Sequence, residues 1–193
     1  MPRRPHTALI LEASAETLAP VVSADGLNAR GAMQAFITWA TSTSRREELI
    51  RRSAFPVPDD MLAFLVVSQL AYQGSARPTE LANATRTGRS NLSKVLRRLE
   101  EVELVGRMVN PDDGRETRVA LTPNGREVAE RIIAAAETDY ADATAEWTEE
   151  ERVVFNDLFV RLVLDLDRRV GGEIRRFSGA PWSVSPRPWD PRS

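Results

Sequence analysis

The sequence predicts a mainly α-helical fold with one small β-hairpin. Apolar residues recur every three or four positions before residue 102 and after residue 122, which is the spacing of one buried helix face. Between these segments lie two short strand candidates, 105–110 and 116–121, and the second alternates polar and apolar residues. With 193 residues and 42% hydrophobic content, the chain is long enough to bury a proper core.

The first segments of the chain are an extension and a long helix. Residues 1–26 form an N-terminal extension, in which residues 7–18 suit a short helix to which no function is assigned. Residues 27–53 are predicted to be one amphipathic helix that ends before Pro56 and Pro58. Its apolar positions are Met33, Phe36, Ile37, Ala40, Leu49 and Ile50.

A strongly apolar helix is predicted next. Residues 61–72 are apolar on nearly every side, which is typical of a helix buried in a domain core. Asp59 and Asp60 precede this segment, where acidic side chains favour a helix N-terminus, and Gly74 marks its end. Pro78 then suits the first turn of a shorter helix.

Positive charge is concentrated in residues 81–99. This stretch carries five basic side chains and no acid, although the whole chain has a formal net charge of −2. A turn at 85–88 leads into its second helix, for which Gly88 or Thr87 is the expected N-terminal cap. A solvated surface helix, the alternative interpretation, would usually mix charges of both signs. One face of the helix is apolar and must face a core, through Leu92, Val95, Leu96, Leu99 and Val102.

The opposite face of this helix has the chemistry that duplex DNA requires. Short hydrogen-bonding side chains near its start can reach base edges, and arginines can neutralise phosphates. The candidates for base contact are Arg89, Ser90, Asn91, Ser93 and Lys94, with Asn91 suited to adenine. The candidates for phosphate contact are Arg86, Arg97 and Arg98, with Arg107 or Arg118 in addition.

Two short helices, a turn and a following hairpin together predict a winged helix-turn-helix over residues 58–122. The hairpin follows the basic helix directly, with a turn cluster at 111–114. This combination is much more specific than any of its parts.

The remaining segments are predicted to be two long helices and a tail. Thr122 caps the first, which runs to about residue 146, and Thr148 opens a capping box with Glu151 at the start of the second, which ends at Gly171. The apolar stripes of residues 27–55 and 123–172 need partners, which predicts a helical dimerisation region. The alternative is an intrachain bundle without dimerisation. Residues 173–193 are predicted to be an irregular tail containing proline and tryptophan.

The composition excludes several classes of protein. The absence of cysteine excludes disulfides, thiolate catalysis and zinc-thiolate sites, and the single histidine, His6, has no clustered partners. We find no nucleophile–base–acid set, metal cluster or phosphate-binding loop, so no enzyme activity, cofactor or metal is expected. No apolar run approaches the ~20 residues of a membrane span, and no convincing signal peptide begins the chain, so a soluble cytoplasmic protein is expected.

From the helix-turn-helix to the end of the hairpin, the sequence resembles the MarR family of bacterial and archaeal transcription regulators. It departs from the family at Gly88, where a serine cap is usual, at Glu103, which replaces a glycine, and at Gly114, which replaces an arginine. The resemblance covers about residues 60–126 by motif. It rests on Glu80-Leu81-Ala82, the run from Ser90 to Glu100, Leu104-Val105 with Arg107, and the wing sequence from Pro111 to Arg115 with Leu121-Thr122-Pro123-Asn124-Gly125.

The resemblance implies a second DNA contact and a ligand. In the family, the wing motif Asp-x-Arg, here Asp113 and Arg115, places an arginine in the minor groove beside the basic helix in the major groove. Members of the family often bind small aromatic molecules in a crevice between the dimer helices and the winged unit. The candidates to line such a crevice are Phe36, Trp39, Phe64 and Tyr72, for which a place in the core is the alternative.

The expected function is that of a homodimeric, sequence-specific DNA-binding transcription regulator that reads a pseudo-palindromic operator. The resemblance implies a repressor modulated by a small aromatic effector. The alternative is a winged-helix protein-interaction module that does not bind DNA. Such a module would keep the apolar stripe but not the acid-free basic face.

Overall fold

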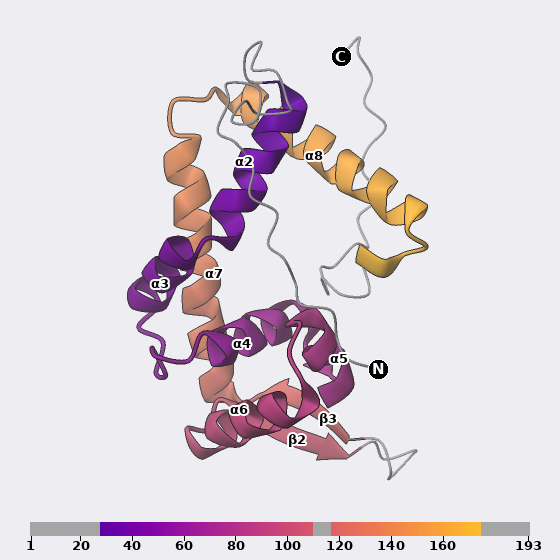
Figure 1. Cartoon of the computed structure of the whole chain (residues 1–193). Coiled ribbons are helices and arrows are strands. Elements are labelled where there is room, and N and C mark those ends of the chain that lie inside the picture. The colour runs from indigo at the N-terminus through magenta and orange to yellow at the C-terminus, as the bar shows by residue number, and fades with distance from the viewer. Residues whose placement is uncertain (1–27, 110–116, 175–193) are drawn as a thin grey trace, which may run out of the picture. The chain divides into compact units, whose positions relative to one another are not determined.

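The computed structural model describes residues 28–109 and 117–174, which are mainly α-helical with one small antiparallel sheet (Figure 1). The predicted fold class is confirmed. The helices are α2 (Ala29–Thr41), α3 (Thr43–Arg52), α4 (Met61–Gln73), α5 (Pro78–Ala84), α6 (Arg89–Glu101), α7 (Pro123–Ala143) and α8 (Glu149–Arg169), and the strands are β1 (Ser75–Ala76), β2 (Val105–Val109) and β3 (Thr117–Leu121). The suggested helix at 7–18, the wing residues Asp113 and Arg115, and the chain after residue 174 lie outside the described residues.

The chain divides into two compact units, Met1–Thr41 and Ser42–Ser193, and α2 is the described helix of the first unit. The side-chain oxygen of Asn28 accepts a hydrogen bond from the Gly31 amide at 3.0 Å, at the start of α2. Phe36 and Trp39 lie on α2 with ring centroids 5.8 Å apart, and both side chains are exposed.

The prediction of one helix over residues 27–53 is wrong. The structure has two helices, α2 and α3, which are separated at Ser42. The backbone of Ser42 is extended, and its hydroxyl accepts a hydrogen bond from the Arg45 amide at 3.3 Å. Because a serine that caps a helix N-terminus needs a non-helical backbone, this cap starts α3 and interrupts the preceding helix.

α4 is the central helix of the second unit. It contacts α3, α5, α6 and α7 as well as β1 and β3. Asp60 caps α4 by accepting a hydrogen bond from the Ala63 amide at 3.0 Å, and Gly74 ends the helix with a φ of 70°. The predicted core helix is confirmed, since its buried side chains are Ala63, Phe64, Val66, Val67 and Leu70.

The sheet has three strands in the order β1-β3-β2, and each neighbouring pair is antiparallel. β2 and β3 form the predicted hairpin, with Val105 opposite Leu121. β1 was not predicted, and it pairs Ser75 with Ala120. Two residues are too few to show the alternation of a strand in the sequence, so β1 is defined only by its pairing with β3.

The backbone approaches itself closely where β3 leads into α7. The Thr122 hydroxyl accepts a hydrogen bond from the Gly125 amide at 3.0 Å and donates one to the Glu103 carbonyl at 2.5 Å. A Cβ atom on Gly125 would lie 1.9 Å from the carbonyl oxygen of Leu104. Only glycine fits there, so this position fixes the start of α7 against the winged unit.

An aromatic cluster joins the end of α7 to the start of α8. The ring centroid of Phe155 lies 6.5 Å from that of Tyr140, 5.3 Å from that of Trp147 and 5.6 Å from that of Phe159. The Tyr140 hydroxyl also donates to the side-chain oxygen of Asn156 at 2.8 Å. α7 ends at Ala143 rather than near residue 146.

α8 begins with the predicted capping box. The Thr148 amide donates to Glu151 Oε2 at 2.7 Å, and the Glu151 amide donates to the Thr148 hydroxyl at 3.2 Å. Most apolar side chains of α8 are exposed in the single chain, namely Val153, Val154, Phe155, Leu158, Val160, Leu162 and Leu166, as is Val170 directly after the helix. Across the residues that the structure describes, no helix is long and apolar enough to cross a membrane.

Candidate DNA-binding surface

α5 and α6 form a helix-turn-helix in the second unit. At the start of α5 the Arg77 amide donates to Glu80 Oε2 at 2.7 Å. In the turn, Arg86 has a positive φ of 51°, and the Thr87 amide donates to the Ala82 carbonyl at 2.9 Å. These backbone contacts set the direction in which α6 leaves α5.

α6 has one buried face and one exposed face, as its sequence predicts. Leu92, Val95, Leu96 and Leu99 are each at most 5% exposed, and α6 contacts α4, α5 and β2. Val102 does not continue this stripe, because the helix has ended there, and its side chain is 36% exposed. The exposed residues of α6 include every predicted DNA contact on the helix, namely Arg89, Ser90, Asn91, Ser93, Lys94, Arg97 and Arg98.

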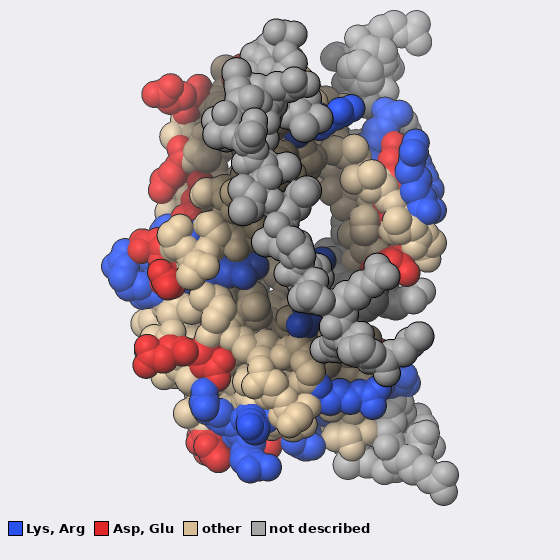
Figure 2. All heavy atoms as spheres, viewed as in Figure 1, with Lys and Arg blue, Asp and Glu red and all other residues tan. Residues whose placement is uncertain are grey.

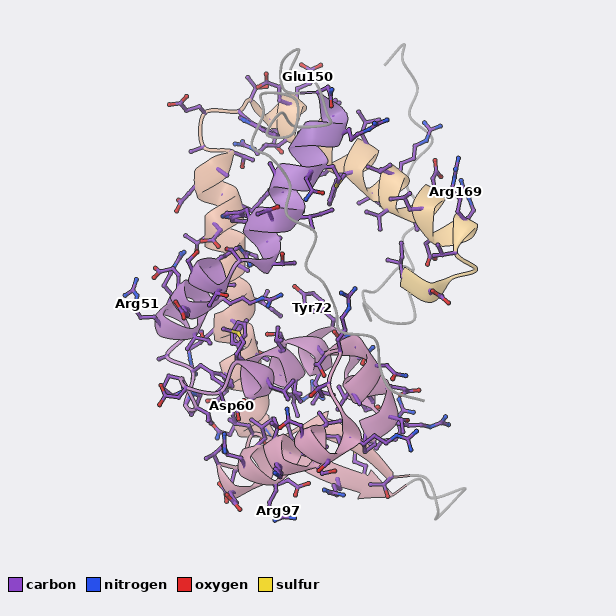
Figure 3. All side chains as sticks on the ribbon, in the orientation of Figure 1. Arg51, Asp60, Tyr72, Arg97, Glu150 and Arg169 are labelled. Atoms are coloured by element: carbon purple, nitrogen blue, oxygen red, sulfur yellow. The ribbon has the colours of Figure 1, made fainter. Side chains whose placement is uncertain are left out.

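Four exposed cations of α6 and of the turn before it have no ion-pair partner within residues 28–109 and 117–174, and we call them the basic face: Arg86, Arg89, Lys94 and Arg97. Arg97 projects outward from α6 in Figure 3. Basic atoms gather over the lower part of the surface in Figure 2, where Figure 1 places α6. No acid of the described chain neutralises these charges, so they are available to an anionic partner.

The polar side chains of α6 keep part of their hydrogen-bonding capacity. The Asn91 amide group donates to the Thr87 hydroxyl at 3.2 Å, and the Ser93 hydroxyl donates to the Arg89 carbonyl at 2.9 Å. Asn91 retains a second N–H and a carbonyl oxygen, and the Ser93 oxygen can still accept. Both side chains therefore remain able to contact a base.

Three of the predicted phosphate contacts are paired with other groups of the chain. Arg98 forms an ion pair with Asp60, and Arg107 Nε lies 2.6 Å from Glu100 Oε1. Arg118 donates to the hydroxyl of the β1 serine at 3.1 Å and to its carbonyl at 2.9 Å. The partner of Arg98 was missed in the sequence, because 38 positions separate the two residues and no periodicity links them.

The charges of α6 run against its helix dipole. A helix N-terminus carries partial positive charge and is stabilised by acids, whereas its C-terminus is stabilised by bases. α6 has Arg89 in its first turn and no acid there, while in its last turn the acids Glu100 and Glu101 outnumber the single base, Arg98. Each misplaced charge costs about 0.3–1 kcal/mol of folding free energy. The same arrangement strengthens the positive potential at the N-terminal half of α6, which attracts anions.

The aromatic candidates for an effector crevice divide between the core and the surface. Phe64 is 3% exposed and lies edge-on to Phe55, with ring centroids 5.6 Å apart, so it takes the core position that was the alternative. Tyr72 is 52% exposed on α4. Phe36 and Trp39 belong to the other unit. For these three exposed residues, the effector site stays a prediction.

The surface offers positive charge and hydrogen-bond donors. Among the residues with described positions, no group of three or more His, Asp or Glu side chains could hold a metal ion. Such a surface can bind a polyanion through charge and hydrogen bonds. The wing residues Asp113 and Arg115 lie outside the described residues, so their contact stays a prediction.

Sequence comparison matches this part of the chain to regulators of transcription. The model of the MarR family matches residues 61–117. The uncharacterized HTH-type transcriptional regulator YxaD of Bacillus subtilis is 30% identical over 100 residues, which are 52% of this chain and 70% of that protein. A second B. subtilis regulator, YsmB, is 24% identical over 122 residues, which are 63% of this chain and 81% of that protein.

Solved structures share the fold. Transcriptional regulator Tm0710 from Thermotoga maritima has a TM-score of 0.54 and 21% identity, covering 72% of this chain and 93% of its own. Wild-type apo MarR from Escherichia coli has a TM-score of 0.51 and 20% identity, covering 72% and 98%. NadR in complex with 4-hydroxyphenylacetate has a TM-score of 0.50 and 23% identity, covering 75% and 97%. The chain therefore belongs to the MarR family of transcriptional regulators rather than to any class of enzyme.

Proposed function

We propose that the chain is a homodimeric repressor that binds duplex DNA at specific sequences. The observation that carries this proposal is the basic face, whose four cations are exposed and have no acidic partner in the described part of the chain. A chain with a net charge of −2 is not attracted to DNA as a whole. Binding must therefore depend on a local surface of this kind.

The N-terminal half of α6 is the part that we propose enters the major groove. Arg89, Ser90, Asn91, Ser93 and Lys94 lie there, exposed, at positions from which side chains can reach base edges. Arg86 and Arg97 flank this group and suit phosphate contacts. The wing residues Asp113 and Arg115 would add a contact in the minor groove.

Dimerisation is proposed from the exposed apolar side chains of α8. Leu158 is 48% exposed and Leu166 is 44% exposed, on a helix with five further large apolar residues that are exposed. Contiguous apolar surface of this kind marks an interaction site, and a second copy of the chain is the partner that we propose for residues 27–55 and 123–172. A two-fold dimer would present two α6 helices to successive major grooves of a pseudo-palindromic operator.

A small aromatic effector completes the proposal. NadR, which shares the fold, was solved in complex with 4-hydroxyphenylacetate. Phe36, Trp39 and Tyr72 are exposed aromatic side chains of this chain and are candidates to contact such a molecule. A ligand that prefers a conformation in which the two α6 helices of the dimer do not fit successive major grooves would reduce the population that can bind DNA.

Selection of bound sequences from a pool of random duplexes tests DNA binding, specificity and dimerisation together. We expect two inverted half-sites about 10 bp apart, centre to centre. On the selected duplex, the logarithm of the affinity should fall by about 0.9 per logarithmic unit of salt for each phosphate contacted. Adding a phenolic acid should weaken binding if the effector proposal holds.

Two arginine variants give a matched comparison in this assay. Arg97→Ala should lower the salt slope by about 0.9, because it removes one phosphate contact. Arg51→Ala should leave the slope unchanged, because Arg51 lies on α3 and already pairs with Glu48 at 2.5 Å. A pool without enriched sequences and a flat salt dependence would contradict DNA binding and leave the protein-interaction module.

A further inference from the structure

Two neighbouring arginines of α6 differ in their partners. Arg97 and Arg98 are both exposed, but only Arg98 has an acidic partner among the described residues. That partner, Asp60, lies before α4, so the ion pair joins α6 to a different helix. The sequence alone predicts the same role, phosphate contact, for both arginines.

Asp60 uses its two carboxylate oxygens for two separate tasks. Oδ1 accepts the Ala63 amide at 3.0 Å and caps α4, while Oδ2 pairs with Arg98. The side chain of Asp60 is 12% exposed and that of Arg98 is 54% exposed. The hydrogen bond to the Ala63 amide therefore fixes the Asp60 carboxylate, and the longer and more exposed Arg98 side chain reaches it.

This pairing lowers the attraction between Arg98 and DNA. A phosphate that approaches Arg98 also approaches the negative charge of Asp60, so the two contributions largely cancel. Arg97 forms no ion pair with an acid in residues 28–109 and 117–174, so its charge is not cancelled in this way. An ion pair that is half exposed adds little to folding stability, so its effect on charge and position is the larger one.

The same division extends along α6. The basic face lies in the turn before α6 and in the helix up to Arg97. Beyond this point Arg98 is paired with Asp60 and Glu100 is paired with Arg107. The two ion pairs fasten the C-terminal half of α6 to the start of α4 and to β2, and they leave the N-terminal half free to approach a groove.

We propose that Asp60 is a positioning residue that withholds Arg98 from DNA, so that Arg97 supplies the phosphate contact and Arg98 holds α6 in place. This inference rests on the proposed DNA binding and assigns roles within it. It makes sequence discrimination depend on the residue that caps α4, which does not touch DNA.

Three full-chain variants test the inference on the selected duplex and on a random duplex, at about 50–200 mM salt. Arg97→Ala should reduce the salt slope by about 0.9, which is about a 3.5-fold change in affinity over a fourfold change in salt. Arg98→Ala should leave the slope unchanged, although it removes the same charge one residue away. Asp60→Asn should steepen the slope by about 0.9, because Arg98 is released to a phosphate.

Asp60→Asn is chosen because asparagine caps helices as well as aspartate does, so α4 keeps its cap while the ion pair is lost. We expect this variant to bind the random duplex more tightly and to discriminate less between the two duplexes. The gain should vanish in the Asp60→Asn, Arg98→Ala double variant, because the released arginine is then absent.

The results separate two kinds of failure. A wild-type chain that binds both duplexes without salt dependence, or binds neither, overturns the proposed function and this inference with it. A wild-type chain that binds with a steep slope, but loses as much slope with Arg98→Ala as with Arg97→Ala, overturns the inference alone. If Asp60→Asn fails to unfold cooperatively, the comparison of the two arginine variants decides the matter without it.

Discussion

α8 and α6 place their charges in opposite directions along the helix axis. α8 has Glu149, Glu150 and Glu151 in its first turn and Arg168 and Arg169 in its last, which is the stabilising direction. Figure 3 labels Glu150 and Arg169 near its two ends. Its capping box adds two hydrogen bonds at the N-terminus, yet most of its apolar side chains are exposed.

α6 shows the reverse combination. It begins at Gly88 without a side-chain cap, and Arg89 lies in its first turn. Its four apolar side chains are nonetheless buried against α4, α5 and β2. Packing therefore holds α6 in place, whereas local signals favour α8.

The difference indicates what each helix is for. α6 lacks a side-chain cap and has unfavourable charges at its ends, but its apolar face is buried. We propose that these charges serve DNA binding rather than folding. A helix with good local signals and an exposed apolar face needs a partner beyond the described part of the chain. The same kind of substitution should therefore have different effects on stability and binding in α6 and in α8.

Leucine truncation should show the largest difference. Leu99→Ala on α6 should lower the free energy of unfolding by about 2–5 kcal/mol, because the side chain is 0% exposed. Leu158→Ala on α8 removes the same group where it is 48% exposed, and should cost about 0.5 kcal/mol or less in dilute protein. Urea unfolding at several protein concentrations measures both. Equal losses at every concentration would mean that one chain already covers the face of α8.

Charge reversal at the start of α6 should have opposite effects on stability and on binding. Arg89→Glu places an acid in the first turn and should raise the free energy of unfolding by about 0.3–1 kcal/mol. The same change should weaken binding to the selected duplex by about tenfold or more, since it removes a proposed base contact and adds repulsion. Thermal unfolding and a binding titration measure the two effects.

Lys94→Glu is the matched control for that experiment. It reverses the same charge in the middle of α6, where the helix dipole has little effect, so binding should weaken without a gain in stability. A less stable Arg89→Glu variant would show that the charge at the start of α6 does not conflict with the dipole.

Local patterns predicted most of this architecture. The spacing of Leu92, Val95, Leu96 and Leu99 predicted the buried face of α6, and Thr148 with Glu151 predicted the start of α8. These features depend on residues within one or two turns of each other, which is the range over which sequence periodicity and capping act.

Features that depend on distant residues were missed. The ion pair between Asp60 and Arg98 joins two helices, and β1 exists through its pairing with β3. The break at Ser42 depends on nearby residues, but apolar residues continue at helical spacing on both sides of it. The sequence therefore predicted one continuous helix, and the cap at Ser42 was missed. For α8 the helix and its apolar residues were predicted, but the spacing of apolar residues does not show which element or partner covers them.

Lowering the pH should destabilise the N-terminus of α8 but not that of α6, and this is the smallest effect that we expect. The Thr148 amide and hydroxyl both donate to Glu151 Oε2, at 2.7 and 3.0 Å, and they hold the pKa of Glu151 below its ordinary value. A carboxylate with a lowered folded pKa stabilises the fold above its unfolded pKa of about 4.3, and this contribution is lost as the pH falls through the folded value. α6 has no acid in its first turn and should show no such loss.

Amide hydrogen exchange between about pH 6 and pH 3, corrected for intrinsic rates, should therefore show the first turn of α8 loosening below about pH 4.3 while the first turn of α6 does not change. Glu151→Gln is the control, because glutamine keeps a side-chain oxygen for the Thr148 amide and has no proton to gain. In that variant the pH dependence at the start of α8 should vanish. If it persists, the acid sensitivity arises from Glu149 or Glu150 acting through the helix dipole rather than from the capping box.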